Sequence, residues 1–326
     1  MSGERVLEIE DLHVWFELGD GRELHAVRGV SLALEGGERF GLVGESGSGK
    51  TTTILAVMGL LPPNASVAGR VLLDGQDLLA RGERSARPHR WSDVAMVFQG
   101  AMNAFNPVQR IGDQIAEPME LHEVAEGKEA RRRVAELLER VGIPAARASR
   151  YPHEFSGGMR QRAALAMALA CNPKVLLADE PTTALDVMVQ AQILELLTSL
   201  ANDFGLAVVL VTHDLPVVAH VCSRAAVMYA GEIVETGPVE ALYHEPRHPY
   251  TRLLYAATPE LHADGDLASI PGAPPRLDRP LAGCPFQPRC DRAFAPCTEE
   301  HPPLLGVGPG REAACHLNTA VREVQA

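Results

Sequence analysis

One glycine-rich stretch carries the strongest signal in this chain: Gly44-Glu45-Ser46-Gly47-Ser48-Gly49-Lys50-Thr51. It fits the pattern G-x-x-x-x-G-K-[ST], in which backbone N–H groups surround the phosphates of a nucleotide. The apolar run Arg39–Val43 before it predicts a strand, and a helix is expected from Thr51 to about Leu61. A phosphate-binding loop requires both elements, which a glycine-rich turn matching by chance would lack. The sequence therefore predicts a nucleoside triphosphate site.

The residue types of this stretch are suited to binding an anion. Glycine permits backbone angles closed to other residues and lets the chain approach a phosphate closely. The helix N-terminus adds partial positive charge and unpaired N–H donors. We expect Lys50 to reach the outer phosphates and Thr51 to place its hydroxyl on Mg²⁺. The predicted ATP-binding residues here are Gly44, Glu45, Ser46, Gly47, Ser48, Gly49, Lys50, Thr51 and Thr52.

Composition and charge narrow the class of protein. The chain has 326 residues, 46% hydrophobic and 22% charged, and its length predicts one large domain with a smaller part, or two domains. A net charge of −12 disfavours a nucleic-acid binder, because phosphate neutralisation needs clustered Lys and Arg. No apolar run reaches the roughly eighteen residues of a membrane span, and Met1–Arg5 does not resemble a signal peptide. We therefore expect a cytoplasmic chain.

Hydrophobic patterning predicts an α/β chain with a helical insertion and a distinct C-terminal part. The pattern between Ile111 and Ala170 is helical, and Gly142 is an expected helix stop. From about Pro238 the composition shifts, and ten of the 24 prolines lie between Pro271 and Pro309, which predicts a separate, loop-rich extension. The expected strands are 6–9, 12–16, 26–34, 70–73, 94–98, 175–178 and 206–211.

Two further segments carry candidate chemistry. Asp179 and Glu180 end a predicted strand, where Asp179 would hold Mg²⁺ and Glu180 would polarise the attacking water. An apolar run ending in Asp-Glu is otherwise a common strand-to-turn signal. Ser156 is a good helix N-cap, and Gly157 and Gly158 let an anion approach the helix that follows, although an ordinary capped helix start is the alternative.

Together these motifs resemble those of ATP-binding cassette (ABC) ATPases over roughly residues 5–237. The signature-like segment has Phe155 for the usual Leu and Met159 for the usual Gln. The motifs occur in family order: Walker A at Gly44–Thr51, a Q-loop at Gln99, the signature at Phe155–Met159, the end of Walker B at Asp179-Glu180, a D-loop at Ala184-Leu185-Asp186 and a switch histidine at His213.

The resemblance implies a P-loop NTPase fold: an ABC nucleotide-binding domain over 1–237, followed by a Cys-containing extension over 238–326. The domain would contain a RecA-like core, an antiparallel β subdomain and a helical subdomain at about 101–170. The implied catalytic residues are Glu180, His213 and Gln99. The implied Mg²⁺ ligands are Thr51, Gln99 and Asp179. The implied contacts to a partner subunit are Ser156, Gly157, Gly158 and Met159, with Asp186 in the D-loop.

In this family an aromatic side chain stacks on adenine. Phe16 is the preferred candidate, and its neighbour Trp15 is the rival, because strand alternation sends the two side chains to opposite faces. Simple packing of both rings is the alternative.

The resemblance narrows to the dipeptide and oligopeptide importer branch. Three segments carry it: Phe155–Arg162, Phe105-Asn106-Pro107 and Pro246–Thr251. The branch implies two ATPase subunits beneath two membrane permeases at the cytoplasmic face of the cell (inner) membrane, with an external substrate-binding protein. The second ATPase is a paralogue or another copy of this chain. The helical insertion and the groove near Gln99 would receive a coupling helix from the permease.

Six cysteines fall into two groups. Cys171 and Cys222 lie in apolar stretches and are interpreted as buried packing residues. The other four have the spacing C-x₅-C-x₆-C-x₁₇-C, without the tight pairs of a structural zinc site, and disulfides are disfavoured in a reducing cytosol. Members of the branch carry an iron–sulfur cluster here, so the resemblance implies [4Fe–4S], with zinc or free thiols as alternatives. The four are Cys284, Cys290, Cys297 and Cys315.

The implied function is ATP hydrolysis that powers import of dipeptides or oligopeptides. Closure of an ATP-bound dimer would drive the permeases. Sugars, metal chelates or opines are alternative solutes. A soluble ABC ATPase acting on DNA or ribosomes predicts a second cassette or a long coiled-coil insertion, and this sequence has neither. A non-hydrolysing ATP sensor is disfavoured by Glu180 and His213.

Overall fold

The structure, a computed structural model, describes residues 4–19, 21–100, 104–183, 185–257 and 270–318. These residues form two units, each built from several stretches of the chain. The first unit contains the described residues up to Leu7, together with Leu34–Arg39 and Leu78–Leu210. The second unit contains Glu8–Ala33, Phe40–Asp77 and the described residues from Val211 onward.

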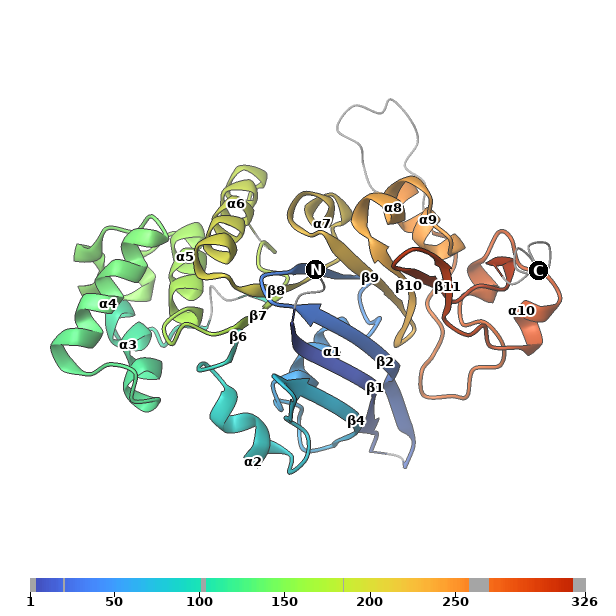
Figure 1. The fold of residues 1–326 in the computed structure, drawn as a ribbon, viewed down its shortest axis with the longest axis horizontal. Coiled ribbons are helices and arrows are strands. Elements are labelled where there is room, and N and C mark those ends of the chain that lie inside the picture. Colours follow the sequence, from blue (N-terminus) through green and yellow to red (C-terminus); the bar gives the residue numbers. More distant parts are fainter. Residues whose placement is uncertain (1–3, 20, 101–103, 184, 258–269, 319–326) are drawn as a thin grey trace. The chain divides into compact units, whose positions relative to one another are not determined.

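A four-stranded sheet, mainly in the second unit, has the order β2-β1-β4-β5 (Figure 1). Apolar residues alternate into its core along β1, but the alternation shifts by one between Ile9 and Leu12. Asp11 lies at this shift with a φ of +47°, and its N–H donates to Ser31 Oγ. The strand therefore continues through a local irregularity where the sequence predicted two segments. The bounds are β1 (Arg5–Glu17), β2 (Glu23–Glu35), β4 (Ala65–Leu73) and β5 (Gln76–Asp77).

The second unit also contains strands in the order β11-β12-β10-β9-β3. β3 runs parallel to β9, and β10 pairs antiparallel with both β9 and β12. The described residues from Pro238 onward are called the C-terminal segment, and this segment adds β11 and β12 to the sheet. The bounds are β3 (Arg39–Val43), β9 (Arg224–Tyr229), β10 (Glu232–Pro238), β11 (Leu305–Gly308) and β12 (Arg311–Ala313). The helices of this unit are α1 (Lys50–Val57), α7 (Leu215–Val221), α8 (Val239–His244), α9 (Pro249–Ala256), α10 (Pro296–Glu299), η5 (Gln287–Arg289) and η6 (His316–Asn318).

The first unit combines three strands in the order β8-β7-β6 with a group of helices. β6 and β7 pair in parallel, and every residue of both is buried, as expected for a parallel sheet covered on both faces. The bounds are β6 (Val94–Val97), β7 (Val175–Asp179), β8 (Ala207–Thr212), α2 (Glu83–Ala86), η1 (Arg87–His89), α3 (Ile111–Leu121), α4 (Gly127–Arg140), η3 (Ala145–Ser149), η4 (Pro152–Glu154), α5 (Gly157–Ala168) and α6 (Val187–Phe204).

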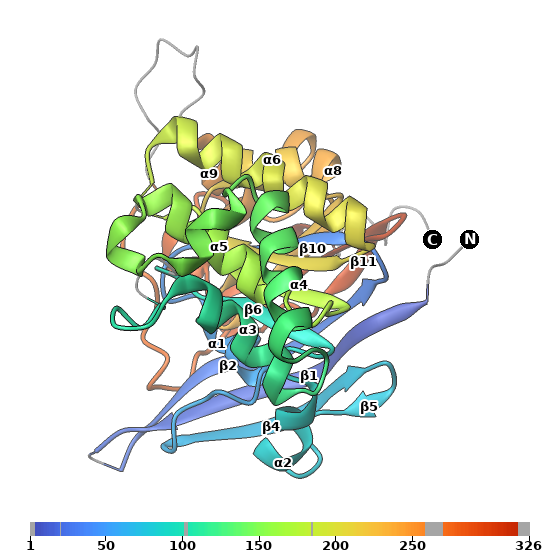
Figure 2. The ribbon, with the colours of Figure 1, turned by 90° about the vertical axis from the view of Figure 1, so that its left-hand side faces the viewer.

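The predicted helical insertion is confirmed. Helices α3, α4 and α5 pack together, as Figure 2 shows. Val134, Leu137 and Leu138 are buried on one face of α4, and Gly142 follows the helix with a φ of +73°. Glycine suits this position because a left-handed residue ends the helix there at no steric cost. The apolar spacing in the sequence therefore located both the buried face and the helix stop.

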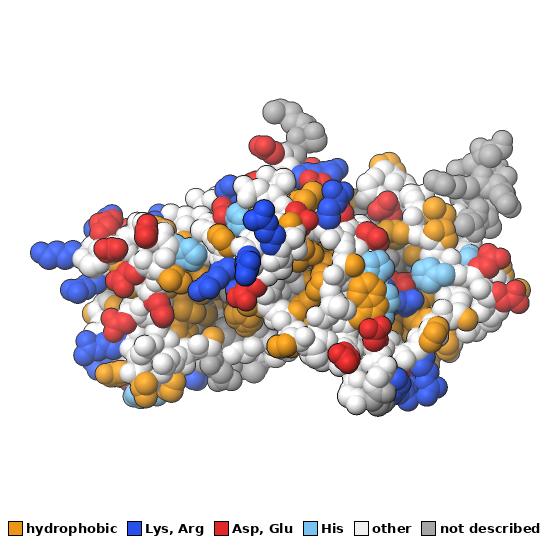
Figure 3. Space-filling view, turned by 90° about the horizontal axis from the view of Figure 1, so that it is seen from below, with side chains coloured by type: hydrophobic (Ala, Val, Ile, Leu, Met, Phe, Trp, Pro, Cys, Tyr) orange, Lys and Arg blue, Asp and Glu red, His pale blue; other side chains and the backbone are white. Residues whose placement is uncertain are grey.

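The described helices and the charges on one face of the surface bear on the membrane and nucleic-acid alternatives. None of their helices is both long and apolar enough to cross a bilayer. On the face drawn in Figure 3, Lys and Arg side chains lie among Asp and Glu side chains. This mixture agrees with the acidic net charge of −12.

A buried carboxylate fixes the start of the C-terminal segment. Glu235 on β10 is fully buried, and its two oxygens accept the backbone N–H groups of Arg247 and His248 at 2.7 and 2.9 Å. Next to it, the Nδ1 atom of His248 accepts the N–H of Tyr250 at 3.0 Å and so caps α9. Burial lowers the pKa of His248 from 6.5 to about 3. The neutral imidazole is therefore the form that caps the helix.

We predict a pH-dependent loss of stability from His248. Between about pH 6.5 and pH 3 the unfolded chain binds a proton here that the folded chain excludes, so stability falls as the pH drops through this range. From pH 7.5 to 5.0 this site should cost about 2 kcal/mol. His248→Asn keeps a capping oxygen but cannot titrate. Urea unfolding at both pH values should show a smaller loss in the variant, and an equal loss in both proteins would contradict the prediction.

Candidate functional site

The glycine-rich stretch joins β3 to α1 in the second unit, as predicted. Lys50 is buried at the start of α1, and its Nζ donates to the carbonyl oxygens of Gly44 and Glu45 at 2.7 and 2.9 Å. At Gly44 a Cβ atom would lie 2.2 Å from the carbonyl oxygen of Met228. At Gly49, where φ is +104°, it would lie 2.7 Å from the carbonyl oxygen of Ala26. Glycine is therefore required at both positions for the loop to keep this shape.

The same loop is held from the C-terminal segment, which the sequence did not predict. The N–H of Glu45 donates to the hydroxyl oxygen of Tyr250 at 2.9 Å. The guanidinium of Arg289 donates to both carboxylate oxygens of Glu45, at 2.7 and 2.9 Å. Glu45 and Arg289 are 244 positions apart, so no local pattern reveals the pair.

In the first unit the structure brings two predicted catalytic residues together. Glu180 follows β7, and its Oε2 accepts hydrogen bonds from Gln99 Nε2 at 2.8 Å and Thr183 Oγ1 at 2.9 Å. The backbone of Glu180 has a φ of +43°, which is uncommon for a non-glycine residue and often marks a functional site. Asp179, the last residue of β7, is 1% exposed. The two neighbouring carboxylates therefore sit in different environments.

The signature-like segment and the predicted D-loop each supply the N-cap residue of a helix. Ser156 Oγ accepts the N–H of Met159 at 3.3 Å at the start of α5, and Asp186 Oδ1 accepts the N–H of Val189 at 3.0 Å at the start of α6. A Cβ at Gly158 would lie 2.8 Å from Val189 Cγ1, so α5 and α6 approach closely at this glycine. Ala184 of the predicted D-loop lies outside the described residues.

The other predicted site residues belong to the second unit. His213 is exposed directly after β8. The Trp15 ring stacks on His25, with centroids 4.6 Å apart, and on His13 at 5.3 Å. The neighbouring Phe16 is half-buried on β1. Phe16 stays the predicted partner of adenine, with Trp15 as its rival.

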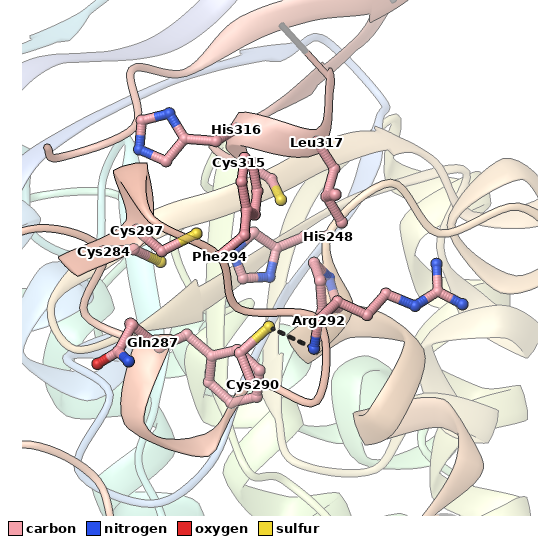
Figure 4. A pocket seen from close by; sticks show the side chains of 12 residues that line it. His248, Cys284, Gln287, Cys290, Arg292, Phe294, Cys297, Cys315, His316 and Leu317 are labelled. Carbon is pink, nitrogen blue, oxygen red and sulfur yellow. Dashed lines mark hydrogen bonds between the residues drawn. The ribbon is translucent and has the colours of Figure 1, made fainter. Parts of the chain in front are cut away.

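Four cysteines line one pocket of the C-terminal segment, as Figure 4 shows. Burial raises the pKa of Cys284 to about 11, and negative charge on the other three cysteines adds to the shift. Among the described residues, no group of three or more His, Cys, Asp or Glu is arranged to hold a single metal ion. The pocket is lined in part by Cys284, Cys290, Cys297 and Cys315. As predicted, Cys171 and Cys222 are buried elsewhere.

Comparison with known proteins decides the family. The model of the family described as ABC transporter matches residues 27–183, and that of the oligopeptide/dipeptide transporter C-terminal region matches residues 234–297. The oligopeptide transport ATP-binding protein OppD of Salmonella typhimurium is 46% identical over 313 residues, 95% of this chain and 93% of that protein. The dipeptide transport ATP-binding protein DppD of Bacillus subtilis is 47% identical over 304 residues, 92% of this chain and 90% of that protein. The chain belongs to the ABC transporter ATPase family.

Solved ABC structures agree with this assignment. The dimeric post-hydrolysis state of the cassette MJ0796, bound to ADP and phosphate, is 29% identical and gives a TM-score of 0.64, covering 72% of this ABC ATPase and 98% of that chain. The structure of cbiO1 from Clostridium perfringens is 28% identical with a TM-score of 0.63, covering 74% of this chain and 92% of that one. The predicted P-loop ABC fold is therefore confirmed.

A pair of substitutions separates the capping role of Ser156 from any role in binding an anion. Ser156→Ala should cost about 1 kcal/mol of stability, because the N–H of Met159 loses its acceptor. Ser156→Asp keeps a capping oxygen and should lose much less stability, while its carboxylate repels a phosphate group at this helix start. Urea unfolding measures the first effect and ATP turnover the second. Equal destabilisation of both variants would contradict the cap assignment.

Proposed function

We propose that this ABC ATPase powers the uptake of dipeptides or oligopeptides through a membrane permease. The observation that carries the proposal is the pairing of a formed phosphate loop with a C-terminal region of the oligopeptide/dipeptide transporter type in one chain. The names of the relatives OppD and DppD support peptides as the solute. The absence of spanning helices among the described residues fits a peripheral subunit at the cytoplasmic face of the inner membrane.

The proposed chemistry assigns each motif a role in ATP hydrolysis. Lys50, the loop glycines and the N-terminus of α1 bind the phosphates, and Phe16 stacks on the base. Glu180 polarises the attacking water, with its carboxylate oriented by Gln99 and Thr183. His213 contacts the outer phosphate. Mg²⁺ would neutralise phosphate charge, and its proposed ligands Thr51, Gln99 and Asp179 all offer the oxygen atoms that this ion prefers.

We further propose that two such subunits close around ATP. Each phosphate loop would face Ser156, Gly157, Gly158 and Met159 of the opposite subunit. The dimeric state of the related cassette MJ0796 supports this arrangement. In this chain Val187 and Met188, directly after Asp186, are 77% and 72% exposed. Large apolar side chains exposed side by side favour a protein contact, which here is the second ATPase subunit.

The proposed permease contact lies on the helical part of the first unit. A groove of about 690 Å³ runs between α3, α4 and η3, and both charged and apolar side chains line it, among them Arg110, Asp113, Ala116 and Val134. Grooves of this kind accept an amphipathic helix. We propose that a coupling helix of the permease binds this region, while an external binding protein delivers the solute to the permease.

We propose in addition that the four cysteines hold a [4Fe–4S] cluster. Four thiols around one pocket supply the Cys₄ set that such clusters use. Zinc requires four ligands that converge on one ion, and the described residues form no group of that kind. When bound, the cluster would cross-link a segment with few regular elements and so stabilise it.

Replacement of Glu180 tests the proposed hydrolysis. Glu180→Gln should lower phosphate release roughly 10² to 10⁴-fold, because the base is lost, while ATP binding persists and the ATP-bound dimer accumulates. Phosphate release and size-exclusion chromatography with light scattering measure the two effects. Glu195→Gln, an exposed change of the same kind on α6, serves as the control. Wild-type turnover in the Glu180 variant would contradict the assignment.

Anaerobic purification tests the cluster. The protein should show a broad absorption band near 400 nm and about four irons and four sulfides per chain. Cys297→Ser should lose the band, whereas Cys171→Ser should keep it. Stoichiometric zinc, or no metal, would contradict the cluster and leave the ATPase assignment unaffected.

A further inference from the structure

The C-terminal segment is hydrogen-bonded to the phosphate loop at Glu45. Its N–H donates to Tyr250, its carboxylate accepts two hydrogen bonds from Arg289, and its carbonyl oxygen accepts one from Lys50. Glu45 is thus bound on one side by the segment and on the other by the lysine expected to reach the phosphates. A shift of Glu45 would therefore move one of the two carbonyl oxygens that accept hydrogen bonds from Lys50.

Arg289 holds Glu45 from a buried and fully engaged position. Its side chain is 5% exposed, and the fork of its guanidinium matches both oxygens of Glu45. The remaining donors are engaged as well: Nε donates to the carbonyl oxygen of Pro271 at 2.8 Å, and Nη1 to the hydroxyl of Tyr229 at 3.3 Å. A buried charge held by so many partners has little freedom to move. The position of Glu45 therefore follows the position of the backbone that carries Arg289.

That backbone belongs to the cysteine pocket. Arg289 ends the short helix η5, and the next residue, Cys290, lines the pocket together with Cys284 from the other side of η5. Two backbone hydrogen bonds close this turn. The N–H of Arg289 donates to the carbonyl oxygen of Phe286, and the N–H of Cys290 donates to that of Gln287. Phe286 packs against Tyr229 and Tyr250 in one buried aromatic cluster. The cysteine pocket, the helix η5 and Glu45 are therefore linked by continuous packing and hydrogen bonds.

We propose that Arg289 and Tyr250 are positioning residues for the phosphate loop, and that they couple the cysteine pocket to nucleotide binding. The coupling rests on the proposed nucleotide site at this loop. It is reciprocal: a shift of the pocket backbone that carries η5 and Arg289 alters nucleotide affinity, and a bound nucleotide in turn stabilises η5. No residue of the segment needs to touch the nucleotide.

Nucleotide affinity tests the positioning role. In titrations with a fluorescent ATP analogue, Arg289→Ala should weaken binding about tenfold, because Glu45 is left as an unpaired, partly buried carboxylate. Arg289→Lys should recover part of the loss, since it keeps the charge but not the fork. Tyr250→Phe should weaken binding by a smaller factor. Arg292→Ala removes an exposed arginine that also lines the pocket and should bind like the wild type.

A double-mutant cycle shows whether Arg289 acts through Glu45. In a Glu45→Gln background, Arg289→Ala should weaken binding much less than it does in the wild type. Equal effects in both backgrounds would overturn the role of this pair. A wild-type protein that does not bind the analogue would refute the nucleotide site itself. Normal binding by both Arg289→Ala and Tyr250→Phe would refute only the positioning role of these two residues.

Hydrogen exchange measures the reverse direction of the coupling in the protein as purified. The analogue AMP-PNP should slow amide exchange at positions 287, 289 and 290 in the wild type and in Arg292→Ala, and should not do so in Arg289→Ala. This readout does not depend on turnover. Exchange of each variant is also measured without nucleotide, because a folding defect would speed exchange there, whereas a loss of coupling would not. Equal protection in Arg289→Ala, or no protection in the wild type, would overturn the coupling.

Discussion

The hydrogen-bonding groups of Glu45 point in different directions, and each is engaged by another part of the second unit. Tyr250 and Arg289 hold its N–H and carboxylate from the C-terminal segment, while Lys50 holds its carbonyl oxygen from α1. A loop that binds phosphate gains affinity when its shape exists before the ligand arrives, because less ordering is required on binding. The shape of the loop that we propose binds the phosphates therefore depends on a residue that need not contact them.

Close backbone approach sets the second constraint on this loop. At Gly44 and Gly49 the neighbouring carbonyl oxygens of Met228 and Ala26 leave no room for a Cβ atom. β9, which carries Met228, also carries Tyr229 of the aromatic cluster beneath the C-terminal segment. One strand thus supports the loop on one side and the segment on the other. This shared support explains how a segment so distant in sequence reaches the phosphate loop.

Much of the fold was predictable because its signals are local. The loop pattern located β3 and α1, and the apolar spacing of Val134, Leu137 and Leu138 located α4. The catalytic role of Gln99 was expected only through the family resemblance, and its hydrogen bond to Glu180 was not predicted, since the two residues follow different strands. The pair of Glu45 and Arg289 could not be predicted, because it joins the phosphate loop to the short helix η5, and neither segment carries a periodic pattern. The continuous β1 was missed because the apolar alternation changes phase at Asp11.

A crystal structure of the chain with ATP and Mg²⁺ would show directly whether Arg289 holds Glu45 while the nucleotide is bound. We expect Lys50 Nζ to leave the carbonyl oxygens of Gly44 and Glu45 for the phosphates, while the carboxylate of Glu45 keeps both hydrogen bonds to Arg289. A Glu45 carboxylate released from Arg289 in the nucleotide-bound state, with the loop otherwise unchanged, would contradict this expectation.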